Sequence, residues 1–158
     1  LKMYERVGAA VRDSLKDGKF PILLSGDHSS AGGTMAGIKM AYPKSRLGVI
    51  WIDAHADIHT PFTTPSGNMH GMALAMACDI DNLECKVNDP RGETLEYWEQ
   101  IKDVGIPGAK VYPEDIVYIA VRDLEKPENY LLNKFRVHIC TKPFPPFFHQ
   151  TFYCVYFL

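Results

Sequence analysis

The chain has 158 residues, with 17 Lys and Arg against 19 Asp and Glu, so its formal net charge is −2. With 46% hydrophobic and 23% charged residues it has the composition of an ordinary globular protein, which excludes a collagen-like, disulfide-rich or disordered chain. The balanced charge gives no sign of nucleic-acid or anionic-membrane binding, and no apolar run approaches the roughly 20 residues of a membrane span.

The first part of the chain alternates between helix and strand patterns. Apolar residues at three- and four-residue spacings predict an amphipathic helix over residues 1–17. The continuous apolar run at residues 20–24 is typical of a strand covered on both faces. A second helix is expected from about residue 31 to 41, and a second buried strand over residues 47–52.

The same alternation continues further along the chain. A polar loop at residues 59–68 precedes a predicted helix at 70–78, and residues 93–104 carry apolar side chains at helical spacing. A third buried strand is expected at 116–121, followed by a short helix at 127–134. The sequence contains no internal repeat. The alternation of helices and strands predicts an α/β fold with a mainly parallel sheet.

Polar clusters stand directly after the predicted strands. Asp27 and His28 follow the first strand, residues 53–59 follow the second, and residues 122–125 follow the third. Parallel α/β sheets bind ligands in the crevice outside the carboxyl ends of their strands. We therefore expect these clusters to form one functional site.

Asp53, His55 and Asp57 alternate along the chain, so in extended backbone their side chains point to one face. Two carboxylates and an imidazole held close together lose hydration and the carboxylates repel each other, unless a divalent cation binds between them. The mixed set of nitrogen and oxygen ligands suits Mn²⁺, Fe²⁺, Co²⁺ or Zn²⁺. His28, at the end of a neighbouring strand, can join the set. The alternatives are a solvated strand end or a network of capping hydrogen bonds for the triplet, and a capping or core role for His28.

The loop at residues 60–68 is rich in hydroxyl and amide side chains, which can bind a polar substrate, although its composition also fits a surface loop rich in turns. His70 follows this loop. An imidazole titrates near neutral pH and can shuttle protons, but it is equally a polar residue at the start of a helix.

Four segments together resemble the arginase family of ureohydrolases, over about residues 1–134. They are SGDHS at 25–29, WIDAHAD at 51–57, TPFTTPSGNMHG at 60–71 and IVYIAVRD at 116–123. The third looks like arginases proper more than agmatinases. The resemblance implies a three-layer α/β/α fold with a mainly parallel sheet that is incomplete at its C-terminal side.

The resemblance also implies a centre of two Mn²⁺ ions. His28 and Asp57 match ligands of one ion, His55 matches a ligand of the other, and Asp53 matches a bridging ligand. A hydroxide bridging the two ions, held by Asp57, hydrolyses the guanidinium group of L-arginine to L-ornithine and urea in this family. His70 matches the proposed proton shuttle.

The expected substrate contacts include two departures from the family pattern. Thr64, Ser66 and Asn68 lie in the loop that recognises the substrate α-carboxylate in the family. His59 stands where an Asn is usual, and Glu125 stands where an Asp helps to bind the α-amino group. These changes leave open another ureohydrolase activity, namely that of an agmatinase, a guanidinobutyrase or a formimidoylglutamase.

The last part of the sequence changes character. We expect residues 1–134 to be the N-terminal part of an arginase-like domain and residues 135–158 to be an atypical tail, because five of the eight Phe fall in the last 15 residues. One interpretation is that the chain is a truncated or frame-shifted product, or a fragment. The alternative is that the tail is a hydrophobic segment that packs on the sheet. A later Asp-x-Asp motif and a substrate-binding Glu of the family are missing, so an inactive fragment is a further alternative.

The remaining expectations concern partners and location. The resemblance implies a small guanidino substrate and a homo-oligomer, a trimer or hexamer, for the intact protein. The four Cys form no paired or zinc-binding pattern, which is typical of free thiols in a reducing cytosol. We therefore expect a cytoplasmic protein that binds neither nucleic acid nor membranes.

Overall fold

The computed structural model describes residues 1–140 and 153–157. In chain order its α-helices are α1 (Lys2–Lys16), α2 (Ser30–Ala41), α3 (Ala73–Cys78), α4 (Glu93–Lys102) and α5 (Lys126–Lys134). The strands are β1 (Gly48–Ile52), β2 (Ile116–Ile119), β3 (His138–Cys140) and β4 (Tyr153–Phe157). Short 3-10 turns lie at Met69–Met72, Leu83–Cys85 and Pro113–Asp115.

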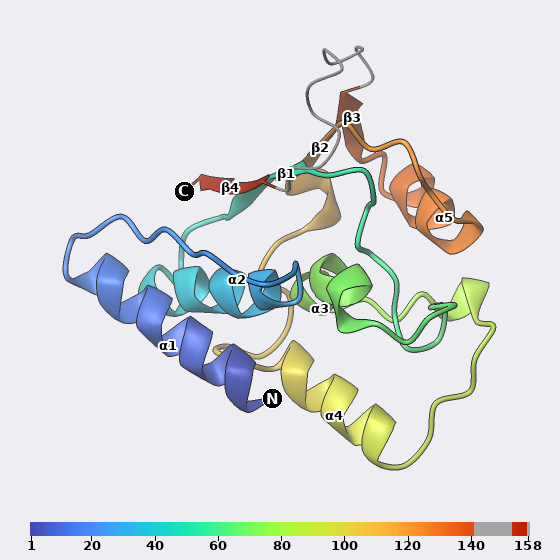
Figure 1. Ribbon diagram of the computed structural model, residues 1–158, viewed down its shortest axis with the longest axis horizontal. Coiled ribbons are helices and arrows are strands. Elements are labelled where there is room, and N and C mark those ends of the chain that lie inside the picture. The colour runs from blue at the N-terminus through green and yellow to red at the C-terminus, as the bar shows by residue number, and fades with distance from the viewer. Residues whose placement is uncertain (141–152, 158) are drawn as a thin grey trace.

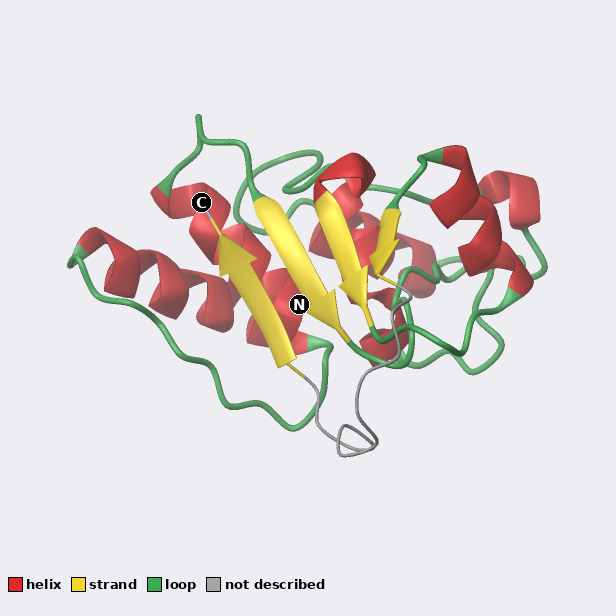
Figure 2. Ribbon diagram, turned by 90° about the horizontal axis from the view of Figure 1, so that it is seen from above, coloured by secondary structure: helices red, strands yellow, loops and turns green. Residues whose placement is uncertain are grey.

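The strands form one four-stranded sheet in the order β3-β2-β1-β4. β1 pairs in parallel with β2, and β2 pairs in parallel with β3, whereas β4 runs antiparallel to β1 (Figure 2). The side chains of β1 and β2 alternate between buried and half-buried positions, so one face of the sheet is the more deeply covered. Trp51 and Tyr118, which are fully buried, pair across β1 and β2 in the middle of that face.

The helices α1, α2 and α3 lie on one side of the sheet, and α5 lies beside β3 (Figure 1). α1 forms an amphipathic helix because Tyr4, Gly8 and Val11 recur at helical spacing and are buried. α2 consists mainly of small residues and is buried along most of its length. The two helices pack closely, because a Cβ added to Gly37 of α2 would come within 2.5 Å of the Gly8 carbonyl oxygen of α1.

The α/β fold with a mainly parallel sheet is confirmed. The helices of the described residues cover one face of the sheet, so two of the three expected layers are seen in that part of the chain (Figures 1 and 2). The helix predicted at 70–78 is a 3-10 turn followed by α3. None of the helices described is long and apolar enough to cross a membrane.

The strand predicted at residues 20–24 is wrong. These residues form an irregular segment, and Ile22 and Leu24 are 80% and 94% exposed. The physical reason is that the edge of β1 is already occupied by β4, which pairs along the whole of β1 from Gly48 opposite Phe157 to Ile52 opposite Tyr153. Residues 20–24 therefore find no free backbone N–H and C=O groups at this edge of β1 with which to form strand hydrogen bonds.

The predicted atypical tail contains two strands. β3 extends the parallel sheet beyond residue 134, and β4 supplies the antiparallel edge strand. The other residues of the tail, 141–152 and 158, lie outside the described residues.

Candidate functional site

The candidate metal ligands lie just beyond the end of β1, in a segment that β2 holds in place. The Asp53 N–H donates to the Ile119 carbonyl oxygen at 3.1 Å, which extends the β1–β2 pairing by one residue. The buried hydroxyl of Tyr118 donates to the Ala56 carbonyl oxygen at 2.9 Å. The register of the two central strands therefore fixes the backbone that carries the ligands.

This backbone is bent, in contrast to the extended conformation expected. The chain bends at residues 53–55, and Asp57 has a φ of 49°, in the left-handed region. The bend sends Asp53 and Asp57 into the protein, where they are 4% and 5% exposed. The side chain of His55 instead stays about half exposed.

Three side chains converge on one point. His28 Nδ1 lies 2.7 Å from Asp53 Oδ2 and 2.8 Å from Asp57 Oδ2. The ligand atoms of these three residues all lie within 4.8 Å of one another, as a single metal ion requires. His28 reaches the cluster from the turn before α2, and its ring packs on Trp51 of β1 with ring centroids 4.6 Å apart. Two distant segments thus supply one set of donors.

The two carboxylates of the cluster titrate differently. Burial raises the pKa of Asp57, and it outweighs the hydrogen bond from His28; the nearby Asp53 carboxylate adds to the increase. Burial also raises the pKa of Asp53, but the hydrogen bonds from His28 and the His55 N–H prevail, so the pKa of Asp53 is lowered. Two buried carboxylates this close favour a cation between them, and a divalent metal fits this donor set.

His55 lies next to the cluster without being part of it. Its Nδ1 is 3.4 Å from Asp53 Oδ1, and its Nε2 is 3.8 Å from Asp123 Oδ2. The structure thus places His55 against the carboxylate that the resemblance matches to a bridging ligand. Asp123, which the sequence analysis did not select, is an exposed carboxylate beside it.

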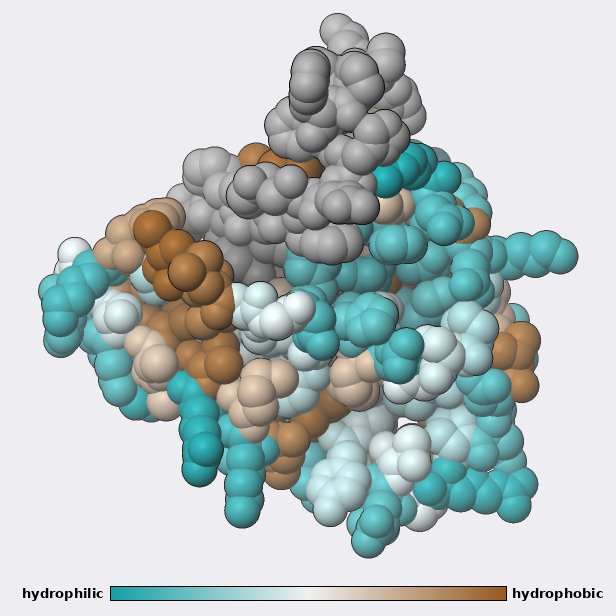
Figure 3. Space-filling view, in the orientation of Figure 1, coloured by the Kyte–Doolittle hydropathy of each residue, from teal (hydrophilic) through white to brown (hydrophobic). Residues whose placement is uncertain are grey.

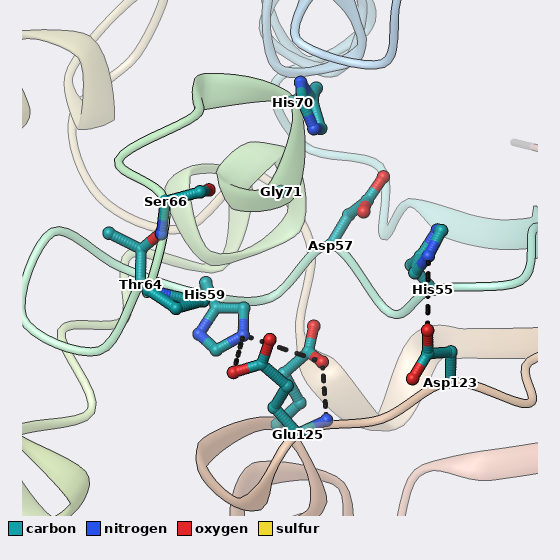
Figure 4. A pocket seen from close by; sticks show the side chains of 11 residues that line it. His55, Asp57, His59, Thr64, Ser66, His70, Gly71, Asp123 and Glu125 are labelled. Atoms are coloured by element: carbon teal, nitrogen blue, oxygen red, sulfur yellow. Dashed lines mark hydrogen bonds and ion pairs between the residues drawn. The ribbon is translucent and has the colours of Figure 1, made fainter.

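A cavity of about 210 Å³ opens beside the cluster (Figure 4). Figure 4 shows His70, Asp57 and His55 on the right of this cavity, and His59, Thr64, Ser66 and Glu125 on the left. The lining residues are His55, Asp57, His59, Thr64, Pro65, Ser66, His70, Gly71, Asp123, Glu125 and Glu128. Of the sequence-predicted substrate contacts, Asn68 alone does not line this cavity.

The loop that carries Thr64 and Ser66 is held by its own hydroxyl groups. Thr64 Oγ1 accepts hydrogen bonds from the Ser66 and Gly67 N–H groups at 3.3 and 3.0 Å. Ser66 Oγ accepts from the Asn68 N–H at 3.2 Å. The loop is therefore a set of local turns that presents its hydroxyl groups to the cavity.

Glu128 is a site residue that sequence reasoning missed. Its carboxylate is buried, and His59 Nε2 lies 3.7 Å from it and 3.6 Å from Glu125 Oε2. Burial raises the pKa of Glu128. The available signal was the capping box of α5, in which Glu125 precedes the helix and Glu128 reaches back to the Glu125 N–H at 3.1 Å.

The charge of the cavity indicates what it can hold. Its lining includes four carboxylates and three imidazoles, and none of the residues described along it is Lys or Arg. The His59 Nε2 atom is buried and has no hydrogen-bond partner in the described part of the chain. The chemistry of this wall is complementary to a small, polar and cationic molecule.

Comparisons with known proteins agree with the motif resemblance. A family model described as "Arginase family" matches residues 1–143. The arginase of Bacillus caldovelox is 37% identical over 137 residues, which are 87% of this chain and 40% of that protein. Human arginase-1 is 35% identical over 136 residues, covering 83% of this chain and 36% of its own length.

A solved structure is similar in fold as well. The native structure of Bacillus caldovelox arginase at pH 5.6 superposes with a TM-score of 0.72 at 38% identity. The match covers 87% of this chain and 40% of that structure. The present chain therefore spans about two fifths of the length of the relatives that it matches, and it corresponds to their N-terminal part.

Proposed function

This chain belongs to the arginase family, and from that premise we propose that it is the N-terminal part of a hydrolase that cleaves the guanidinium group of L-arginine to give L-ornithine and urea. The observation that carries the proposal is the His28–Asp53–Asp57 cluster at the mouth of a cavity walled by carboxylates. A guanidinium is a cation, and this wall is complementary to it.

We further propose that the metal is Mn²⁺, with two ions in the complete protein. His28, Asp53 and Asp57 would hold one ion, and Asp53 and His55 would contribute ligands to the second. Bound divalent cations supply a nucleophile at neutral pH, because they lower the pKa of coordinated water from about 15.7 towards 7. The short distances from His28 Nδ1 to both carboxylates support this assignment.

The other groups of the cavity divide into two sets. Asp57, which lies at the metal cluster, would orient the attacking oxygen by a hydrogen bond, and His70 on the same side would carry a proton to the leaving amine (Figure 4). On the opposite side, Glu125 would hold a substrate ammonium group. Thr64 and Ser66 would donate to a carboxylate, and Asn68 lies in the same loop.

A second candidate is the hydrolysis of a different guanidino or formimino compound. The observation that favours it is the contact of His59 with Glu125 and Glu128, since the imidazole occupies the space in front of both carboxylates. We expect His59→Asn, in a longer protein that carries this sequence, to lower the KM for L-arginine. Rates with L-arginine, agmatine and formiminoglutamate would distinguish the candidates, because the second predicts that one of the latter two is the better substrate.

The central test compares metal binding with turnover. We expect the 158-residue chain to bind Mn²⁺ weakly and to release little urea from L-arginine, because the later Asp-x-Asp motif and Glu of the family are not in it. In a longer protein with those residues, Asp57→Ala should abolish urea release in a colorimetric assay with added Mn²⁺. The exposed Asp89→Asn variant is the control and should keep full activity. Urea release that survives Asp57→Ala would contradict the metal assignment.

The cytoplasmic location and the trimeric or hexameric assembly of the intact protein stay predictions. A sedimentation measurement on the longer protein would check the assembly.

A further inference from the structure

Asn88 lies in the segment between α3 and α4 and binds the loop that forms one side of the candidate cavity, although it does not line that cavity itself. Its Nδ2 donates to the carbonyl oxygens of Pro61 and Thr64 at 3.1 and 2.7 Å. Its backbone N–H and that of Val87 donate to the Phe62 carbonyl oxygen at 2.9 and 2.8 Å. Asn88 thus contacts three carbonyl groups of the loop.

The loop needs these partners because it contains a helical turn that is not continued. The N–H groups of Thr63 and Thr64 donate to the Thr60 carbonyl oxygen at 3.0 and 2.9 Å, which closes the turn. The carbonyl groups that follow Thr60 then lack donors from a further helical turn, and the segment that carries Asn88 supplies them. The Thr60 hydroxyl group donates in return to the Asp81 carbonyl oxygen at 2.8 Å. Hydrogen bonds therefore join the two segments at both ends of the turn.

Apolar packing contributes little to the outer part of this contact. Leu83 and Val87 are exposed, and Figure 3 shows mainly hydrophilic side chains at the right of the view, where Figure 1 places the segment between α3 and α4. A second cavity, of about 570 Å³, borders the same loop, and its lining includes Asn88, Thr64 and Ser66. The loop is therefore a wall between two cavities at Thr64 and Ser66, and its hydrogen bonds fix it there.

The hydrogen bonds inside the loop determine what it presents to the candidate cavity. Thr64 Oγ1 accepts from the N–H groups of Ser66 and Gly67, so both of its lone pairs are occupied and it can act towards a ligand only as a donor. Ser66 Oγ accepts from the Asn68 N–H and keeps its hydrogen for a second bond. Two neighbouring hydroxyl donors suit an anionic group such as a carboxylate.

We propose that Asn88 is a positioning residue that holds the hydroxyl groups of Thr64 and Ser66 in place for a substrate carboxylate. The inference rests on the proposed function, which assigns carboxylate recognition to this loop. Asn88 acts through the Thr64 backbone, to which it donates at 2.7 Å. Loss of its side-chain donors frees the ends of the turn, whereas the two main-chain bonds to Phe62 keep the segments together. Asn88 therefore sets the affinity for a substrate with a carboxylate and leaves the chemical step unchanged.

The first test compares L-arginine with agmatine, which has no carboxylate, in a longer protein that carries this sequence. Asn88→Asp keeps the shape of the side chain but removes both amide donors. We expect the KM for L-arginine to rise at least about tenfold, with kcat and the KM for agmatine unchanged within about twofold. Where agmatine is not hydrolysed, its inhibition constant against L-arginine takes the place of its KM.

Asn133→Asp is the matched control, because it makes the same chemical change on an exposed side chain near the end of α5. It should leave these constants unchanged. A KM that rises equally for both compounds in Asn88→Asp would show a general effect on the fold and overturn the proposal. The absence of a rise for L-arginine would overturn it as well.

Hydrogen exchange of the 158-residue chain tests the same contact without turnover. The amides of Thr63 and Thr64 are bonded within the turn and belong to buried residues. We expect them to exchange at least about tenfold faster in Asn88→Asp than in the unchanged chain, while α2 and β1 keep their protection. If α2 also loses protection, Asn88→Ala, which adds no charge, is judged by the same result. Loss of the fold in both variants would make Asn88 a purely structural residue and refute the positioning role.

The two measurements separate this proposal from the proposed function. If the longer protein releases no urea from either compound, the proposed function fails, and the exchange of the Thr63 and Thr64 amides still decides whether Asn88 holds the loop. If L-arginine is hydrolysed and Asn88→Asp behaves like Asn133→Asp, the proposed function stands and the role of Asn88 is wrong.

Discussion

At the scale of single residues, Lys110 is a buried cation away from the candidate site. It is 2% exposed, and its Nζ donates to the carbonyl oxygens of Gly108, at 2.8 Å, and of Lys102. Burial lowers the pKa of Lys110 to about 8. In the unfolded chain the ordinary value is 10.5, so between these two values the unfolded state binds more protons and stability rises with pH.

This shift predicts how Lys110→Met behaves. The free energy of unfolding of the unchanged chain, minus that of the variant, should increase between about pH 8 and pH 10.5. The expected increase is about 1–2 kcal/mol, because partial solvation weakens the effect. Urea denaturation at pH 7.5 and pH 10 would measure it. The exposed Lys16→Met variant is the control, and an equal increase in that variant would contradict the prediction.

The sequence could predict the residue types of the site better than their positions. Asp53, Asp57 and His28 were selected from their places after strands, and the structure brings these three together. The extended geometry expected for residues 53–57 does not occur, because the chain bends at residues 53–55 and has a left-handed φ at Asp57; the side chain of His55 is half exposed. The capping-box spacing of Glu125 and Glu128 indicated only the start of a helix, whereas the place of Glu128 in the cavity wall depends on how the N-terminus of α5 packs in the folded chain.

At the scale of elements, α1 packs closely against α2, the helix that begins two residues after His28. Gly37 allows the close approach, because an added Cβ would lie 2.5 Å from the Gly8 carbonyl oxygen and 2.7 Å from Val11 Cβ. The first of these atoms belongs to the backbone and cannot rotate away. The helices would have to separate.

We therefore expect Gly37→Ala to lower the free energy of unfolding by about 1–3 kcal/mol, in spite of the better helix propensity of Ala. Thermal denaturation followed by circular dichroism would measure the loss. Gly71→Ala is the matched control, because no atom lies within 4 Å of the Cβ that it adds. A Gly37→Ala variant as stable as this control would show that the two helices are free to shift apart.

The helices and the central strands were predictable because their periodic patterns coincide with burial in the folded chain. α1 and α4 follow apolar stripes, and β1 and β2 follow continuous apolar runs. The segment at 20–24 has the same local signal as β1. Local pattern does not decide which of two apolar runs takes a sheet edge, because that depends on pairing with residues more than a hundred positions away.

At the scale of the whole molecule, metal binding at the candidate site would couple to folding, because the candidate donors come from the turn before α2 and from the end of β1. A ligand that binds only the folded state stabilises it by about 2.7 kcal/mol at 100 times its Kd. For a chain of this size that corresponds to an increase in Tm of roughly 5–10 °C. We expect Mn²⁺ at such a concentration to raise Tm relative to EDTA.

The variant Asp53→Asn should remove most of this increase, whereas Asp89→Asn should keep it. Differential scanning fluorimetry with and without Mn²⁺ would measure both. An equal increase in the two variants would mean that the metal binds elsewhere in the chain.

The left-handed backbone at Asp57 has a consequence for how such a protein can evolve. L-amino acids adopt this conformation at a cost of roughly 1–2 kcal/mol, which glycine does not incur, and Asp tolerates it better than most. A glycine at position 57 would relieve the cost and remove the carboxylate at once. Laboratory selection for heat resistance alone should therefore favour glycine at this position, and only simultaneous selection for turnover would retain the carboxylate.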